Sequence, residues 1–324
     1  MLLSLLAFAF GQEVEVAVQV EAAIRSVEAA ERPPAPLKVS ILPGLGFAAA
    51  SDRPVDGIAV GFVTRSPRVE GLDASLVTVV DGTIEGGQFG IITVSKGGVQ
   101  GGQAAAGLSI AKGFSRGLAV SGGIAVAESW QGVVAAPMTV VSELDGVQMG
   151  MLNVGGSGKG AMVGFVNVAK SLDGPAIGLV NIIGDGMFHV DTWVSESALL
   201  SGAVKFGSKT TYTLIGAGWV RPDGPWWTAG WGLGVHLPAR FVFVESDITA
   251  WMVAEGSLVL PGVHGKLRAQ LGLPLAKRFS PFAGASLNGW WGSGDAWPLL
   301  VGLPSSDRQH RVVFWPGLHA GIQW

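Results

Sequence analysis

Two acidic and two basic residues occupy alternate positions in two nearby segments of the chain, where they could form ion pairs. Glu245 and Asp247 lie two residues apart, and so do Lys266 and Arg268. Because alternate residues of a β-strand point to the same side, both pairs are expected to face one interior. They would form either a charged constriction in a pore or an ion-pair network that fills a small barrel. We favour the network, because side chains alone are enough to fill a small barrel.

Two other patterns resemble catalytic motifs but lack essential parts. Residues 155–160 read Gly-Gly-Ser-Gly-Lys-Gly, which is similar to a phosphate-binding loop, but no Ser or Thr follows Lys159 to bind Mg²⁺. His189, Asp191 and Ser195 share one side of a predicted strand, which suggests an envelope hydrolase. Residues two apart on a strand, however, project in parallel about 6.5–7 Å from each other and form no proton relay. We therefore expect no catalytic residue, no cofactor and no metal site.

The composition restricts the class of protein. Glycine contributes 50 of 324 residues, charged residues make up only 14%, and the mean hydropathy is +0.45. After the first dozen positions no apolar run is long enough for a membrane-spanning helix. Such a chain is either a densely buried soluble protein or a membrane β-barrel with apolar residues at alternate positions. The net charge of −3 gives no broad electrostatic case for nucleic acid, and the absence of cysteine excludes disulfides and thiolate metal sites.

A five-residue motif recurs every 14 residues in the middle of the chain. Its clearest copies begin with glycine and carry asparagine at the fourth position: Gly150 with Asn153, Gly164 with Asn167, and Gly178 with Asn181. Degenerate copies at intervals of 14 to 16 residues reach back to about residue 61. Nearly all charged residues lie in the connectors, and the cores are too rich in glycine for helix. A short fixed period predicts one structural unit copied along the chain, which suits a scaffold better than an active site.

Two architectures fit this period. In a β-solenoid each copy is one coil, so the Asn residues stack as an amide ladder and the Gly residues form a column of close backbone approach. In a meander barrel each copy is one spanning strand with one lipid face and one wet face. Both alternating sets in residues 147–154 are mostly apolar, which favours the solenoid. The Asn column then has a structural role rather than a ligand-binding one.

The last third of the chain has a period of two and ten of the twelve Trp residues. In residues 263–273, for example, Leu267, Ala269 and Leu271 alternate with polar residues. Strands of about 11 residues with one apolar side are typical of membrane barrels. The strand candidates are 39–48, 187–195, 198–206, 210–220, 227–237, 241–253, 263–273, 281–291 and 312–324. They predict a barrel of about eight to ten strands. The expected interfacial aromatic girdle comprises Trp226, Trp227, Trp251, Trp290, Trp291 and Trp315.

The two ends of the chain suggest export and membrane insertion. Residues 2–10 form a short apolar run followed by small residues, which indicates a signal peptide over residues 1–11. The final segment alternates apolar and polar residues, and bacterial outer-membrane barrels typically end on such a strand with a terminal aromatic. We therefore expect Leu318, Ile322 and Trp324 to form a C-terminal signal for the barrel insertion machinery.

The chain resembles a bacterial family of outer-membrane surface-repeat proteins, whose repeats read roughly G-x-Q-x-G-x-x-N-V between barrel-like flanks. The matching stretches are the repeats together with residues 39–46, 189–193 and 212–219. The early repeats depart from the pattern, with Thr93, Ser109, Ala125 and Thr139 at the Asn position and Pro137 within one core. These departures argue against a continuous ladder before residue 150. The resemblance implies no chemistry for any residue.

The sequence thus predicts an all-β protein in which a small transmembrane β-barrel carries an inserted Gly-rich, solenoid-like repeat region. The expected parts are a signal peptide (1–11), a leader (12–37), first barrel strands (38–66), the repeats (67–186) and C-terminal barrel strands (187–324). The predicted function is non-enzymatic, namely an outer-membrane anchor for a repeat module, with outer-membrane lipids as partners and an unknown surface ligand. A single meander barrel of 16–18 strands acting as a porin-like channel or transporter is the alternative, followed by an envelope hydrolase.

Overall fold

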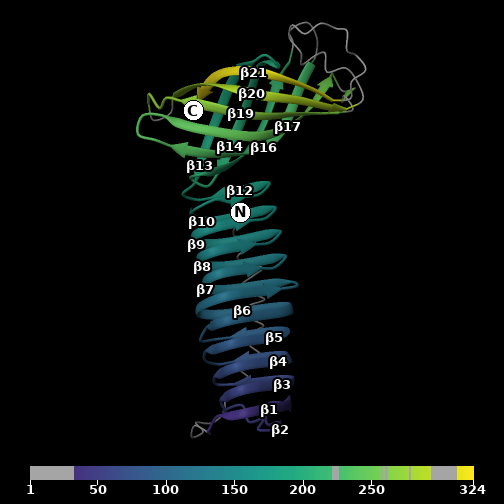
Figure 1. The fold of residues 1–324 in the computed structure, drawn as a ribbon, viewed down its shortest axis with the longest axis vertical. Helices are drawn as coiled ribbons and strands as arrows, with labels where there is room; N and C mark the ends of the chain where they lie inside the picture. Colours follow the sequence, from purple (N-terminus) through teal and green to yellow (C-terminus); the bar gives the residue numbers. More distant parts are fainter. Residues whose placement is uncertain (1–32, 221–225, 257, 260–261, 277–278, 293–311) are drawn as a thin grey trace.

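The computed structural model describes residues 33–220, 226–256, 258–259, 262–276, 279–292 and 312–324. These residues form an all-β molecule with two parts, a parallel β-solenoid and a closed antiparallel barrel (Figure 1). Within the described residues no helix is long and apolar enough to cross a membrane. The expected combination of a small barrel with a solenoid is therefore confirmed, and the single large meander barrel is wrong.

Twelve strands make up the solenoid sheet, and the successive coils pair in parallel. In chain order they are β1 (Ala35–Leu42), β2 (Leu45–Phe47), β3 (Val55–Ser66), β4 (Val69–Val80), β5 (Ile84–Ser95), β6 (Val99–Ser121), β7 (Ile124–Ala135), β8 (Met138–Met149), β9 (Leu152–Val163), β10 (Val166–Asp173), β11 (Ala176–Ile177) and β12 (Val180–Ile183). Only β2 is antiparallel, and it covers the outer edge of β1.

The pairing register of the solenoid follows the sequence period. Val140 pairs with Val154, Val154 with Val168, and Val168 with Ile182, one coil apart in each case. Equivalent residues of successive repeats therefore lie one above the other along the axis, as the solenoid interpretation requires. The first coils obey the same register, since Val55 pairs with Val69 and β1 pairs in parallel with β3.

Residues 38–66 thus belong to the solenoid, and their assignment to the barrel is wrong. The segment 39–48 alternates like a barrel strand because its outward residues are apolar, but β1 pairs with β3 and β2 and with no barrel strand among the described residues. The solenoid strands run from Ala35 to Ile183 rather than over the predicted 67–186.

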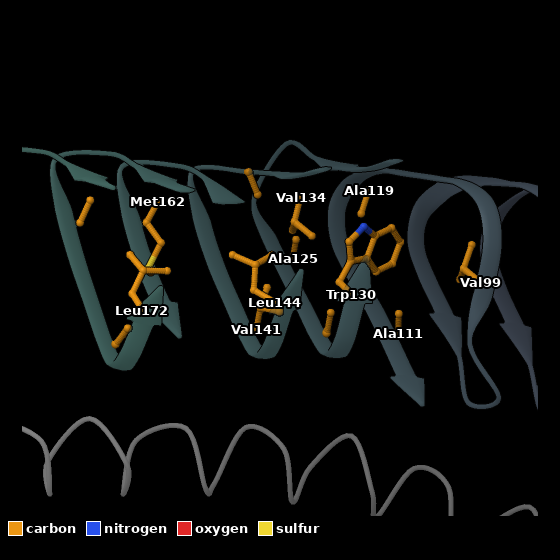
Figure 2. Packing of buried hydrophobic residues seen from close by; sticks show 14 of the residues in the cluster. Val99, Ala111, Ala119, Ala125, Trp130, Val134, Val141, Leu144, Met162 and Leu172 are labelled. Atoms are coloured by element: carbon orange, nitrogen blue, oxygen red, sulfur yellow. The ribbon is translucent and has the colours of Figure 1, made fainter. Parts of the chain in front are cut away.

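The interior of the solenoid is filled by apolar side chains that stack between coils. Trp130, Leu144, Met162 and Leu172 point into it from successive turns (Figure 2), and Trp130 and Leu172 are each only 1% exposed. Such close stacking leaves no space for a side chain at the corners. A Cβ on Gly160, which has φ +122°, would lie 1.9 Å from the carbonyl oxygen of Gly146 in the preceding coil. The predicted column of Gly150, Gly164 and Gly178 is likewise a place of close approach.

Eight antiparallel strands form the barrel, and β18 (Leu258–Val259) is a short addition to one of them. They are β13 (Met187–Ser195), β14 (Ala198–Gly207), β15 (Thr211–Trp219), β16 (Trp226–Pro238), β17 (Phe243–Glu255), β19 (Gly262–Gly272), β20 (Ser280–Gly292) and β21 (Val312–Gln323). Each strand pairs with the next, and β13 pairs with β21 to close the sheet on itself.

Alternate residues of the barrel strands point outward and inward as predicted. Among the described residues no outward position of the eight strands carries a charge; the polar ones are Thr192, Thr211, Thr213 and Ser246. The aromatic girdle needs correction, because Trp251, Trp290 and Trp315 are buried in the barrel interior, at most 6% exposed, and Trp226 is half-buried against the interior cluster that contains Trp290 and Trp315. Outward aromatic residues do lie near the strand ends: Trp219, Trp227, Trp291 and Phe314 at one end, and Phe188, Phe241, Phe279 and Trp324 at the other.

Candidate functional sites in the barrel and the solenoid

The barrel interior holds a network of buried ion pairs. The Lys205 ammonium lies 2.5 Å from carboxylate oxygens of both Asp191 and Glu245, and none of the three side chains is exposed. Asp247 receives two hydrogen bonds from the Arg268 guanidinium, each 2.8 Å long. A bidentate pair of this kind fixes both side chains and neutralises both charges.

Neutral groups complete this network. Tyr212 donates a 2.8 Å hydrogen bond to Asp247, and the amide of Gln270 donates to Glu245. The guanidinium of Arg268 also lies 4.6 Å from the centre of the Trp193 ring, within the range of a cation–π contact. Three carboxylates and three basic side chains are buried together: Asp191, Glu245, Asp247, Lys205, Lys266 and Arg268. The interior charges offset one another.

The four predicted lumenal residues all face the interior, but their pairing differs from the simplest expectation. Register places Arg268 opposite Asp247, whereas Lys266 lies opposite Thr249 and Glu245 opposite Gln270. Glu245 finds its basic partner across the barrel, in Lys205 of β14. Lys205 was not predicted as a lumenal residue, although it is the one charged residue in its strand.

The hydrolase pattern does not form a relay. Asp191 pairs with Lys205 inside the barrel, while the Ser195 hydroxyl bonds to the backbone of Ala198 at the strand end. The ring of His189 packs near the ring of His236, with 6.1 Å between their centres. In the described residues no group of three or more metal-binding side chains is placed to hold an ion.

The predicted amide ladder is present and fully buried. Asn153 donates to Asn167 over 2.7 Å, and Asn167 donates to Asn181 over 2.6 Å. Thr139 extends it by one coil, because its hydroxyl donates to Asn153 over 2.6 Å. Asparagine suits this position since its side chain both donates and accepts, so identical neighbours satisfy one another.

The bonds between asparagine side chains begin at Asn153, as the sequence pattern predicts. In earlier coils the equivalent column holds Thr64, Thr78, Thr93, Ser109 and Ala125. The hydroxyls of Thr78 and Thr93 have no hydrogen-bond partner among the described residues. Those coils contain a second amide contact, limited to one pair of residues, in which Gln103 donates to Gln88 over 2.8 Å.

The ladder ends on the barrel and connects the solenoid to it. Asn181 donates to the hydroxyl of Thr213 on β15 over 2.8 Å, and this hydroxyl donates to the carbonyl oxygen of Gly178 over 3.0 Å. Thr211, two residues earlier, bonds both the backbone N–H and the carbonyl oxygen of Ala176. Outward threonines of the barrel wall therefore replace the missing next coil.

Two buried charged residues lie in the first coils, and neither was predicted from the sequence. The ammonium of Lys38 donates to the carbonyl oxygen of Ala50 and the hydroxyl of Ser66, and burial lowers its pKa to about 8. Burial raises the pKa of Asp73 to about 6, although hydrogen bonds from Thr64 and Ser75 act in the opposite direction. Since each group is buried with hydrogen-bond partners, both have a structural role.

A shallow groove of about 460 Å³ lies on the side of the solenoid that carries Glu143, Asp145, Lys159 and Asp173, which we name the charged edge. These four charged residues line the groove together with Gly158, which has no side chain and stacks between Leu144 and Leu172. The segment 155–160, which resembles a phosphate-binding loop, is part of strand β9 and pairs with β8 and β10. Gly155, Ser157, Gly158 and Lys159 are paired in register with both neighbouring coils, so the segment forms no loop around a phosphate.

The three residues of the predicted insertion signal lie on the outer side of β21 and just after it. Leu318 is 73% exposed, and Trp324 packs edge-on against Phe279.

No protein-family model, curated protein or solved structure matches this chain. The resemblance to the surface-repeat family therefore stays a prediction.

Proposed function

We propose that the protein is a non-enzymatic outer-membrane scaffold, in which a small filled barrel anchors a β-solenoid. One observation carries the proposal: the eight barrel strands present no charge on their outward side among the described residues, whereas Asp191, Glu245, Asp247, Lys205, Lys266 and Arg268 are buried inside. This inverts the usual arrangement of a soluble protein and suits a barrel whose solvent is lipid. Outward aromatic residues near both strand ends support the same assignment, since such girdles sit at membrane interfaces.

The interior of the barrel favours an anchor over a channel. The lumenal charges of a water-filled pore would be accessible to solvent, but Lys205 and Glu245 have no exposed surface and Arg268 has 2%. Eight strands leave just enough space for side chains. The partners of this scaffold would be outer-membrane lipids and the machinery that inserts barrels, with export through the signal peptide.

Membrane fractionation and conductance test this function. The full chain should sediment with the outer membrane and resist extraction by alkaline carbonate. Reconstituted in a planar bilayer, it should give no steady single-channel current. Recovery as a soluble protein would overturn the membrane assignment, and a large steady conductance would overturn the anchor in favour of a porin.

A further inference from the structure

One side of the solenoid is free of exposed charge along its whole length. Nine consecutive coils contribute a segment to this side: residues 57–64, 71–78, 86–93, 101–109, 117–125, 132–139, 146–153, 160–167 and 174–181. The only charged residue in these segments is Asp73, whose side chain is buried inside the solenoid. The remaining part of each coil carries the charges.

Large apolar side chains project outward from this side in stacked columns. Those at least 37% exposed are Ile58, Phe62, Leu76, Phe89, Ile91, Leu118, Val120, Met149, Met151, Val163, Phe165, Ile177 and Leu179, which we name the apolar face. Met151, Phe165 and Leu179, for example, lie directly above one another, because the residues that follow them are paired in register. Soluble monomers rarely expose an apolar surface of this extent.

The apolar face continues onto the outward surface of the barrel. A groove whose exposed lining is almost wholly apolar runs between Met151, Phe165 and Leu179 of the solenoid and Trp231 and Leu233 of β16. The indole N–H of Trp231 donates to the carbonyl oxygen of Leu179 over 3.4 Å. Trp231 and Leu233 belong to the uncharged outward side of the barrel. The two apolar surfaces are therefore one surface.

The charged edge of the solenoid points the other way, toward one end of the barrel. Asp185 forms a 2.9 Å ion pair with Lys209, which lies in the turn between β14 and β15. We name this end of the barrel the docked rim. Trp231, in contrast, lies in the middle of β16. The solenoid leaves the side of the barrel and runs across the direction of front strands such as β19 and β20 (Figure 1).

We propose that the apolar face is covered by lipid, and that the solenoid lies along the membrane with this face in the leaflet at the docked rim. The proposal rests on the proposed membrane function. If the barrel spans the bilayer, a solenoid that leaves its wall sideways extends within the membrane plane, with its apolar side toward the bilayer centre and its charged edge toward water. At about 4.8 Å per coil, nine coils extend about 43 Å from the barrel. Lipid is the one covering that meets both parts of a surface continuous from barrel to solenoid.

The lengths of the connections identify the leaflet. The docked rim carries the connections 208–210, 239–242 and 273–279, whereas the opposite end carries 196–197, 220–225 and 293–311, of which the last is the longest connection of the barrel. Outer-membrane barrels have short turns on the periplasmic side and long loops outside. The solenoid would therefore lie in the periplasmic leaflet rather than project from the cell surface.

Single cysteines carrying an environment-sensitive fluorophore test the proposal, because the chain has no cysteine of its own. The variants are Met151→Cys and Phe165→Cys near the barrel and Phe62→Cys at the far end of the solenoid. Ser157→Cys, on the charged edge, is the matched water-exposed control, and Leu267→Cys, on the outward barrel side, is the lipid-exposed control. All five positions are exposed, so the substitutions leave the interior unchanged. The full chain is reconstituted in phosphatidylethanolamine–phosphatidylglycerol vesicles whose acyl chains carry nitroxide quenchers.

We expect the labels at residues 62, 151 and 165 to be quenched as strongly as the label at 267, and the label at 157 to remain unquenched. Unquenched labels on the apolar face, beside a quenched label at 267, would overturn the lipid covering while leaving the barrel in the membrane. A blue-shifted but unquenched emission at these sites would assign the face to a protein, such as a second copy of the chain, and would equally contradict the proposal. An unquenched label at 267 would overturn the proposed function itself.

Discussion

The solenoid and the barrel both enclose polar groups, but they satisfy them in different ways. In the solenoid, parallel register places each residue against its own copy, so polar groups in a buried column can satisfy one another when each both donates and accepts, as Asn153, Asn167 and Asn181 do. A column of like charges would repel itself. In the barrel, residues from different strands meet across the interior, and opposite charges such as Lys205 and Glu245 can pair. The topology therefore decides which polar residues each interior can hold.

The largest expected effect is the loss of a charge partner in the barrel. Arg268→Met leaves Asp247 buried without its bidentate partner and should destabilise the barrel by about 3–5 kcal/mol. Leu267→Met, on the outward side of the same strand, is the control and should cost less than about 1.5 kcal/mol. Equilibrium unfolding in urea with lipid vesicles measures both values. Equal stability of the two variants would show that the interior network contributes nothing.

A charge placed in the amide ladder should cost nearly as much. Asn167→Asp removes the donor to Asn181 and buries a carboxylate next to two neutral amides, for an expected loss of about 3–4 kcal/mol at pH 7. The control is Thr93→Val in the same column, whose hydroxyl has no partner and whose loss should be close to neutral. Hydrogen exchange of the solenoid amides reports both changes. Indifference to Asn167→Asp would contradict a ladder that stabilises the coils.

Close stacking of the coils predicts a sharp difference between two glycines. Gly160→Ala should cost about 3 kcal/mol, because its φ is +122° and its Cβ would meet the carbonyl oxygen of Gly146. Gly102→Ala should be neutral or slightly stabilising, since no heavy atom lies within 4 Å of the added Cβ. Thermal unfolding followed by circular dichroism compares the two. Similar melting temperatures would mean that the coils are not packed at this spacing.

The smallest expected effect is the pH dependence that the buried carboxyl group of Asp73 gives to the stability of the solenoid. Burial raises the pKa of Asp73 from 3.8 to about 6, so the folded form binds more protons than the unfolded form between these values. The contribution of Asp73 is therefore fully present below pH 3.8 and is lost as the pH rises through 6, with a loss of about 2 kcal/mol between pH 4 and pH 6.5. Burial lowers the pKa of Lys38 from 10.5 to about 8, so this group makes stability depend on pH only above this pH range.

Hydrogen exchange of β3 and β4, corrected for intrinsic rates, should thus show protection that falls from pH 4 to pH 6.5. Asp73→Asn should remove most of this dependence. Asp81 offers a control in Asp81→Asn: burial alone would raise its pKa, but Arg65 and Lys96 lower it, so it is already ionised in this range. A pH profile unchanged by Asp73→Asn would assign the effect to another group.

Much of the fold could be predicted because each topology leaves its own mark on the sequence. In-register stacking requires equivalent residues at a fixed interval, so the series ending in Val154, Val168 and Ile182 gave both the strands and their register. Polar and apolar residues alternate along barrel strands such as β17 and β19, because one side of each strand faces the interior. The segment 39–48 was misassigned because an outward apolar side looks the same in both parts of the molecule.

The partners within the barrel could not be predicted. Lys205 and Glu245 are 40 residues apart and meet only because the sheet closes between β13 and β21. No spacing in the sequence encodes a contact across a lumen. The same holds for Thr213, which completes the amide ladder from the wall of the barrel.

Heat-modifiable gel migration of the full chain, taken from the membrane fraction, tests the central claim most directly. A closed barrel held together by its strand pairing and buried ion pairs should stay folded in cold detergent and migrate faster than the boiled, unfolded chain. We expect this shift, and we expect Arg268→Met to lower the temperature at which the shift is lost. A chain that is recovered in the soluble fraction and migrates identically with and without boiling would contradict it.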